Sequence, residues 1–487
     1  MNRILTLVGL GVFVAGQVCV AQVAGTQPKG TVEEHINRVV GCLHDPVMAA
    51  GDPCIPLEKR MEELHAPGVS IAVIHEGKVE WARGYGVAKT GGPAVAAETM
   101  FQAGSISKPV AAMAALKLVE QKKLVLDEDV NQELTEWKLP ASDAAKGKPV
   151  TLRELLTHTG GTTVHGFPGY AQGAPVPTLE QVLNGEKPAN TPAIRIEAEP
   201  GTRWNYSGGG FTIMQAMMID AAKEPFAKLL HDSVLAPIGM KHSTYEQPLP
   251  AEMGPAATPY NGDGTPVEGG AHTYPERAAA GLWTTAPDLA MYVMENQRSL
   301  EGKANHVLSQ EMTREMMKKG MGDWGLGVQI GGSAADPYFT HGGVNAGFEA
   351  LFVGYENHGD GAVVMTNAQG GLRVAQQVMQ SIAKEYGWPD FKAVVRTEVK
   401  VDRSVLEKYV GTYELAPRFS LTFMLEGDQL VSQATGQSKV PVFPESETKF
   451  FTKVVNAEIE FVKDADGKVS SMVLHQGGRD MKGVRKP

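Results

Sequence analysis

A serine followed three residues later by a lysine is the smallest unit in this sequence that could perform covalent chemistry. The serine hydroxyl becomes a nucleophile when a neighbouring neutral amine takes its proton. The spacing occurs three times, at Ser105 and Lys108, at Ser381 and Lys384, and at Ser446 and Lys449. A claim of catalysis therefore requires that one copy differ in its surroundings from the other two.

The first copy, in "GSISKP", stands where a long helix is expected to begin. Pro109 is tolerated there, because the early N–H groups of a helix have no intrahelical partner. Lys108 would lie on the same helix face as Ser105, and the positive end of the helix dipole would lower the pKa of its amine. A serine at this place can also simply cap the helix. Nucleophile and helix cap are thus alternative interpretations of Ser105.

The other two copies lack this setting. Ser381 lies inside the continuous helical pattern "QQVMQSIAKEY", where its hydroxyl is expected to bond to the backbone or to solvent. Ser446 lies in the polar stretch "PESETK" near the end of the chain. Both are predicted to be structural.

Two later segments add polar groups that could assist a nucleophile. Tyr206 lies in the glycine-rich stretch "PGTRWNYSGGG", where a phenol could transfer a proton, although a buried tyrosine more often bonds to the backbone. His341 ends an apolar run in "FTHGGVNAGF" and is followed by Gly342 and Gly343, which let backbone N–H groups approach a ligand. A single histidine is also often structural. Each segment alone is a weak signal.

The order of these segments resembles the three motifs of the serine β-lactamase and penicillin-binding-protein superfamily. The similarity is to the class C β-lactamase-related branch, which includes D-aminopeptidases, carboxypeptidase-like enzymes and esterases. The phrases "PGVSIAVIHEGK", "LLTHTGG" and "AAGLWTTAPDLA" also look like that family, over roughly residues 57–390. The resemblance implies an α+β fold, with an antiparallel sheet flanked by helices.

The resemblance also implies roles for individual residues. Ser105 would be the acylated nucleophile, Lys108 its base, and Tyr206 a proton shuttle to the leaving group. Backbone N–H groups of Ser105 and Val344 would form the oxyanion hole. No cofactor is expected.

Two departures from the family pattern bear on the substrate. His341 would line the substrate site together with Gly342 and Gly343. It stands where β-lactamases usually carry a lysine. This argues against β-lactamase as the main activity. The second motif ends in Gly208 where the family usually has asparagine, so a carboxamide for the substrate is missing. Selectivity is expected to favour esters over amides.

Composition narrows the classes of partner. The chain has 487 residues, of which 43% are hydrophobic and 21% charged, as in ordinary globular proteins of one to three domains. The formal charge of −10 and the absence of a long basic run argue against nucleic acid, so the expected partner is a small-molecule or peptide substrate.

His158 and His165 lack the spacing of metalloprotease motifs, and no metal is expected. The oligomeric state is left open.

The N-terminus has the pattern of a secretory signal peptide over residues 1–21. A basic Arg3 precedes an apolar stretch and a small-x-small site at residues 19–21. The stretch is shorter than the roughly 20 residues of a membrane-spanning helix, so cleavage is favoured over a membrane anchor. The protein is therefore expected to be exported, to the periplasm or beyond, where Cys42 and Cys54 could pair. The sequence does not decide whether they do.

The remaining chain divides into an arm at 22–56, a hydrolase-like domain at 57–390, a linker at 391–400 and a β domain at 401–487. In the hydrolase-like domain, an apolar run at 69–74, a Glu76-Gly77 turn and a second run from Val79 predict a hairpin. Together with the apolar runs "EALFVGY" and "GAVVMTN", it indicates a sheet assembled from both ends of the chain. The last part shows short alternating strands and resembles the lipocalin-like β domain that some family members carry.

Taken together, we expect a secreted serine hydrolase acting by a covalent acyl-enzyme on small esters or amides, D-amino-acid peptides or esters among them. The alternative is an inactive penicillin-recognising or peptidoglycan-binding module. Intact Ser105, Lys108 and Tyr206 count against that alternative, whereas Gly208 counts for it.

Overall fold

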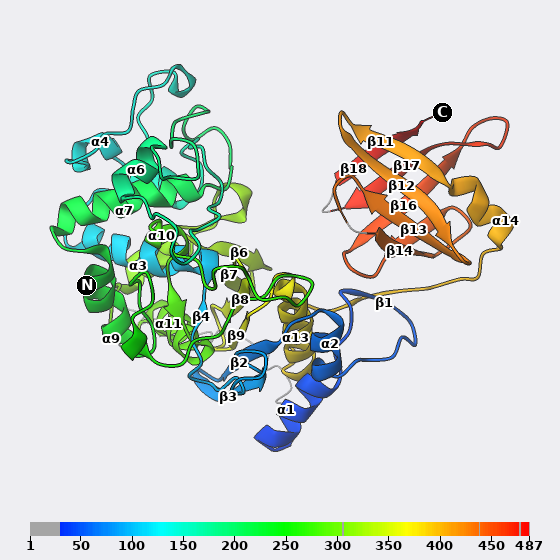
Figure 1. Ribbon diagram of the computed structural model, residues 1–487, viewed down its shortest axis with the longest axis horizontal. Helices are drawn as coiled ribbons and strands as arrows, with labels where there is room; N and C mark the ends of the chain where they lie inside the picture. Colours follow the sequence, from blue (N-terminus) through cyan, green and yellow to red (C-terminus); the bar gives the residue numbers. More distant parts are fainter. Residues whose placement is uncertain (1–29, 304–305, 438, 477–478, 487) are drawn as a thin grey trace, which may run out of the picture.

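The computed structural model describes residues 30–303, 306–437, 439–476 and 479–486. The predicted signal peptide at 1–21 lies outside these residues. The described chain forms an α/β body and a β-barrel, joined by an extended segment (Figure 1). Within the described ranges, no helix has both the length and the apolar character needed to cross a membrane.

A six-stranded antiparallel sheet forms the centre of the body, with strand order β3-β2-β9-β8-β7-β6. The hairpin near the start of the chain thus pairs with a strand near residue 360. The apolar runs predicted such a sheet, assembled from both ends of the chain. The strands are β2 (Gly68–His75), β3 (Lys78–Gly86), β6 (Gln329–Gly332), β7 (Pro337–Asn345), β8 (Phe348–Tyr355) and β9 (Gly361–Thr366).

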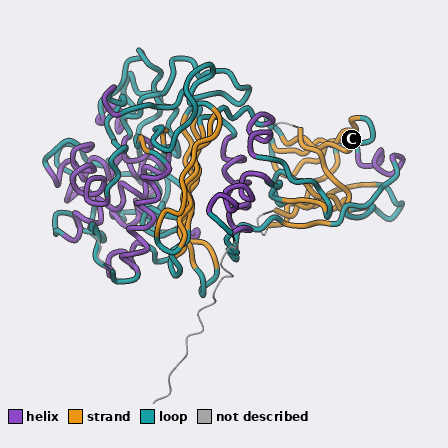
Figure 2. The backbone as a smooth tube through the Cα atoms, turned by 90° about the horizontal axis from the view of Figure 1, so that it is seen from below, coloured by secondary structure: helices purple, strands orange, loops and turns teal. Residues whose placement is uncertain are grey.

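Both faces of this sheet are covered by helices, which explains why its central strands are apolar throughout. In β2, Val69, Ile71 and Val73 contact one hydrophobic cluster, while Ala72 and Ile74 contact the other. Figure 2 shows the strands edge-on between two helical layers. Alternating side chains of one strand therefore serve two separate cores.

The two layers differ in size. The smaller contains α1 (Val32–Gly41), α2 (Leu57–Glu63) and α13 (Gly371–Glu385), and the larger contains α3 (Ser107–Glu120), α7 (Gly208–Ala222), α10 (Arg277–Ala280) and α11 (Ala286–Leu300). Shorter elements complete the body: α4 (Val130–Glu133), α5 (Leu152–Leu156), α6 (Leu179–Asn184), α8 (Phe226–Leu230), α9 (Ala236–Ile238), α12 (Gln310–Met316), and the pair β4 (Phe101–Gln102) and β5 (Trp283–Thr284).

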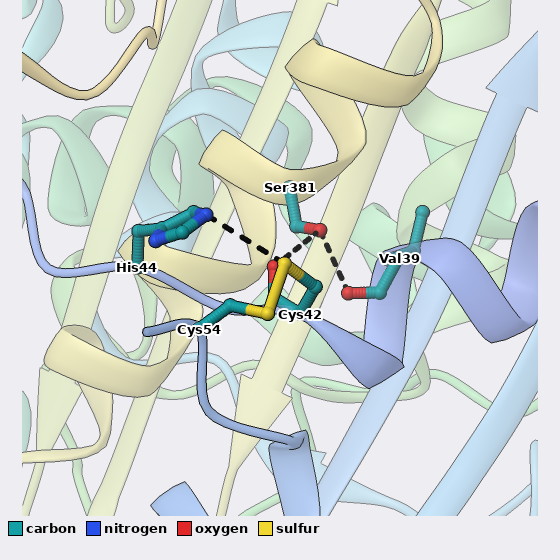
Figure 3. Close-up of a disulfide and its surroundings, with 5 residues drawn as sticks. All are labelled: Val39, Cys42, His44, Cys54 and Ser381. Atoms are coloured by element: carbon teal, nitrogen blue, oxygen red, sulfur yellow. Dashed lines mark hydrogen bonds between the residues drawn. A yellow bond between two sulfur atoms is a disulfide. The ribbon is translucent and has the colours of Figure 1, made fainter. Parts of the chain in front are cut away.

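A disulfide closes a loop within the N-terminal arm, and a hydrogen bond fastens the arm to the body (Figure 3). Cys42 and Cys54 form a disulfide, and Nε2 of His44 lies 3.6 Å from the Cys42 sulfur. From α13, the Ser381 hydroxyl donates a 2.7 Å hydrogen bond to the carbonyl of Val39 near the end of α1. The hydroxyl of the second serine–lysine pair is thus bonded to the backbone, as predicted.

The C-terminal part is a closed antiparallel barrel of eight strands. A short helix, α14 (Arg403–Leu406), precedes β11 (Gly411–Ala416), β12 (Phe419–Glu426), β13 (Gln429–Ala434), β14 (Lys439–Pro444), β15 (Lys449–Thr452), β16 (Ala457–Lys463), β17 (Val469–Gln476) and β18 (Arg479–Arg485). Aromatic rings fill its interior, where Tyr409 stacks on Phe461 at 4.1 Å between centroids. The predicted β domain is therefore confirmed as a barrel with its own core.

The barrel contacts the body through the N-terminal arm and the linker. In this contact β1 (Val47–Ala49) pairs in parallel with β10 (Val394–Arg396). Val47 and Ala49 pack against Phe451 of the barrel, and Lys453 forms a 2.8 Å ion pair with Asp52. The N-terminal arm, in which a disulfide closes a loop, therefore contacts both the body and the barrel.

We expect Ser381→Ala to lower the free energy of unfolding by about 1–3 kcal/mol, because the buried Val39 carbonyl loses its donor. Val39 is among the last residues of α1, whose carbonyls have no intrahelical partner. Urea denaturation measures the change, and Ser381→Thr, which keeps a hydroxyl, is the matched control. Equal stability of wild type and Ser381→Ala would contradict this structural role.

Candidate active site

Ser105 lies in a single 3₁₀ turn, Gly104–Ile106, immediately before α3. This corrects the expectation that it stands in the first turn of the helix itself. Its side chain caps neither the turn nor α3, which begins after Ile106 without a side-chain cap. The helix-cap interpretation of Ser105 is therefore wrong. Its side chain is partly exposed, as a group that meets a substrate must be.

Lys108 extends from the first turn of α3 toward Ser105. Its Nζ donates a 3.1 Å hydrogen bond to the Ser105 hydroxyl and a 2.8 Å hydrogen bond to the carbonyl of Ala279. Ala279 lies in the short helix α10, whose last carbonyls have no partner within that helix. The amine is thus held between the hydroxyl and a fixed acceptor.

Burial lowers the pKa of Lys108 to about 7. The side chain is only 2% exposed, with the ring centroids of Tyr206 and Phe211 at 5.0 and 5.7 Å from Nζ. Among the described residues, no carboxylate lies within 4.0 Å of Nζ to stabilise the charged form. The sequence predicted the direction of this shift from the helix dipole, but its cause is burial.

The other two serine–lysine pairs make no such contact. Ser381 bonds to the backbone of α1 as described above. The Ser446 hydroxyl accepts the N–H groups of Thr448 and Lys449 in a turn, and Lys449 pairs with Glu458 at 3.1 Å. Of the three pairs, only the first joins the amine to the hydroxyl.

Two glycines bring strand β7 against the turn that carries Ser105. A Cβ at Gly343 would lie 1.9 Å from the Ala103 carbonyl, and one at Gly104 would lie 2.5 Å from the backbone nitrogen of Val344. Gly104 also has φ +53°, in the region that favours glycine. The backbones of Ser105 and Val344 are therefore adjacent, as the predicted oxyanion hole requires.

Tyr206 lies just before α7, with its ring beside Lys108. Burial raises the pKa of its phenol, and the nearby Ser105 partly opposes this change. Among the described residues, the phenol oxygen is buried and makes no hydrogen bond. The phenol is thus protonated at neutral pH and close to the nucleophile. It can donate a proton to a group leaving from Ser105.

His341 lies on β7 opposite the Tyr206 ring, at 6.1 Å between centroids. Its Nδ1–H donates a 2.6 Å hydrogen bond to the carbonyl of Gly342, which leaves Nε2 as an acceptor. Burial, together with the nearby Lys108, lowers the pKa of His341 to about 3. The ring is therefore neutral and cannot replace the cation that β-lactamases carry at this place.

The start of α7 shows what occupies the place of the missing carboxamide. Ser207 caps α7 by accepting the N–H of Gly210. A Cβ at Gly208 would lie 2.8 Å from the ring of Phe167. An aromatic ring thus takes up the space into which an asparagine side chain would extend.

One neighbour of the site was missed by the sequence reasoning. His158, considered from the sequence only as a possible metal ligand, is buried and lies against Tyr206 with 4.3 Å between ring centroids. His165 is also near, and its Nδ1–H donates a 2.6 Å hydrogen bond to the Tyr206 carbonyl. The available signal was the phrase "LLTHTGG", which carries His158 and resembles the family.

We expect Gly343→Ala to separate β7 from the Ser105 turn, because the added methyl group would overlap the Ala103 carbonyl. Overpacking of this kind costs about 1–3 kcal/mol, and a 1 Å displacement at a reacting centre costs about 100-fold in rate. Thermal unfolding and the rate of Ser105 acylation measure the two effects.

Gly342→Ala is the matched control for stability, because its Cβ would meet nothing closer than 3.8 Å. A Gly343→Ala protein with the wild-type unfolding temperature and acylation rate would show that the close approach is unnecessary.

Known proteins resemble this chain in sequence. The sequence model of the family described as Beta-lactamase matches residues 57–384, and a domain of unknown function (DUF3471) matches residues 395–485. Penicillin-binding protein 4* of Bacillus subtilis is 21% identical over 80% of this chain and 88% of its own length. Esterase EstB of Burkholderia gladioli is 27% identical over 43% of this chain and 54% of its own length.

A solved structure shows the same fold. The octameric penicillin-binding protein homologue from Pyrococcus abyssi superposes with a TM-score of 0.61 and 23% identity, covering 88% of this chain and 98% of that one. The family match extends over more than half of the chain and contains the whole serine–lysine–tyrosine site. The chain belongs to the Beta-lactamase family.

Proposed function

We propose that this protein is a serine hydrolase that forms an acyl-enzyme on Ser105. One observation carries the proposal: the Ser105 hydroxyl lies 3.1 Å from a buried amine whose pKa is about 7. An amine must be in its neutral form to accept a proton, and a pKa of about 7 makes that form available to Lys108 at neutral pH. Neither of the other serine–lysine pairs has this geometry.

The geometry supports an acyl-transfer sequence. Neutral Lys108 takes the proton of the Ser105 hydroxyl, while the oxygen attacks the acyl carbonyl carbon. The oxyanion is stabilised by the backbone N–H groups of Ser105 and Val344. When the intermediate collapses, the leaving alkoxide or amine receives a proton through Tyr206, which regains it from Lys108. Water then attacks the ester on Ser105, releasing a carboxylic acid and restoring the hydroxyl.

The surroundings of the nucleophile favour esters and small amides as substrates. Phe167 stands beside Gly208, so no carboxamide is present there to hold the amide of a substrate. His341 is neutral and offers no positive charge to a β-lactam carboxylate. The names of the related esterase and penicillin-binding protein support the same range of substrates. D-Amino-acid esters and peptides belong to it.

Export of the protein is part of the proposal. The signal pattern at residues 1–21 supports it, and so does the disulfide between Cys42 and Cys54. Disulfides of this kind persist in oxidising compartments such as the periplasm.

The second candidate function is a binding module that recognises penicillin or peptidoglycan without turnover. The observation that favours it is the loss of the second-motif carboxamide at Gly208. The two candidates differ in whether Ser105 is acylated and then released.

Intact-protein mass spectrometry with a fluorophosphonate probe distinguishes the two. We expect one adduct, mapped by peptide analysis to Ser105 and absent from Ser381 and Ser446. Ser105→Ala and Lys108→Ala should abolish it, and p-nitrophenyl acetate should be hydrolysed faster than the corresponding p-nitroanilide. A folded wild-type protein that forms no adduct would contradict the hydrolase and support the binding module.

A further inference from the structure

His158 has an unusual backbone for a residue that the reaction does not use directly. It follows α5, has φ +59° and is 2% exposed. Left-handed backbone outside glycine is uncommon, and it persists where surrounding contacts hold it. The contacts of His158 are therefore informative.

Those contacts go to both residues that flank Tyr206. The N–H of Asn205 donates a 2.9 Å hydrogen bond to the His158 carbonyl, and the N–H of Ser207 donates a 3.1 Å hydrogen bond to its Nδ1. The imidazole also lies against the phenol ring, with 4.3 Å between centroids and 35° between planes. One residue thus holds the backbone on either side of Tyr206 and one face of its ring.

The hydrogen bond from Ser207 also decides the tautomer. Because Nδ1 accepts, the ring proton lies on Nε2. Burial is the largest cause that lowers the pKa of His158, followed by the nearby Lys108 and His341. The rings of Phe211 and Trp324, at 5.3 and 5.0 Å, complete an apolar surrounding. A second cation beside Lys108 is thus strongly disfavoured.

We propose that His158 is a positioning residue: its neutral imidazole fixes the backbone and ring of Tyr206 so that the phenol meets Ser105. The expected effect of His158 on kcat rests on the proposed function. The conformational statement, that His158 is a neutral Nε2–H imidazole bonded to Ser207, is independent of that function.

Two substitutions separate the contacts of His158. His158→Asn keeps an acceptor where Nδ1 lies and tolerates the left-handed backbone, but it removes the ring. His158→Phe keeps a ring against Tyr206 and leaves the Ser207 N–H unpaired. With p-nitrophenyl acetate as substrate, we expect His158→Phe to lower kcat by about 100-fold with little change in KM, and His158→Asn to lower it by about 10-fold.

His65 supplies a matched control, since it also has a left-handed backbone, with φ +50°, but is exposed. His65→Phe should leave kcat unchanged. A folded His158→Phe protein with wild-type kcat, or one in which only KM changes, would overturn the proposal. If His158→Phe does not fold, the kcat of His158→Asn and the following measurement decide.

NMR of protein labelled with ¹⁵N-histidine tests the conformational statement without activity. The His158 signals are those missing from His158→Asn. We expect the Nε2–H tautomer and no titration between about pH 5 and 8, where ordinary histidines ionise. An Nδ1–H tautomer, or protonation within that range, would overturn the proposal even in an inactive protein. Failure of Ser105 to react with the probe would instead count against the proposed function.

Discussion

The burial of Lys108 without a neighbouring carboxylate is the constraint on which the candidate site depends. A lysine whose pKa falls from 10.5 to about 7 destabilises the folded protein by an amount on the order of several kcal/mol at neutral pH. Because the unfolded chain binds the proton more tightly, this cost decreases as pH rises from about 7 to 10.5. The folded protein remains stable despite this free-energy cost. It therefore holds an amine that is neutral at a pH where ordinary lysines are charged.

The surrounding elements explain how so unfavourable a group is retained. α3 is buried on nearly every side and Lys108 is only 2% exposed, so a charge on its amine would be poorly hydrated. The Ala279 carbonyl fixes the amine from α10, and Gly343 lets β7 close over the turn of Ser105. These elements pack on a sheet buried on both faces. The barrel contacts the N-terminal arm and has an aromatic core of its own.

Much of this arrangement could be predicted, because several signals are local. Apolar runs such as "GAVVMTN" indicated the central strands, and the spacing of Ser105 and Lys108 placed two reactive groups on one face. Other features depend on contacts between distant segments. The pKa of Lys108 is lowered by burial, and distant segments that carry Tyr206 and Phe211 contribute to that burial. His158 acts on Ser207, 49 residues away, and no local pattern reveals such a contact.

Direct titration shows whether the amine of Lys108 is neutral at physiological pH in the free protein. NMR of protein labelled with ¹³Cε-lysine follows each amine through pH, and Lys108→Ala identifies the signal in question. Lys449 is an internal control, because its hydrogen bond with Glu458 raises its pKa above the ordinary value. We expect an inflection for Lys108 at about pH 7, in the free protein and without substrate. An inflection near 10.5, the ordinary value for lysine, would contradict this expectation.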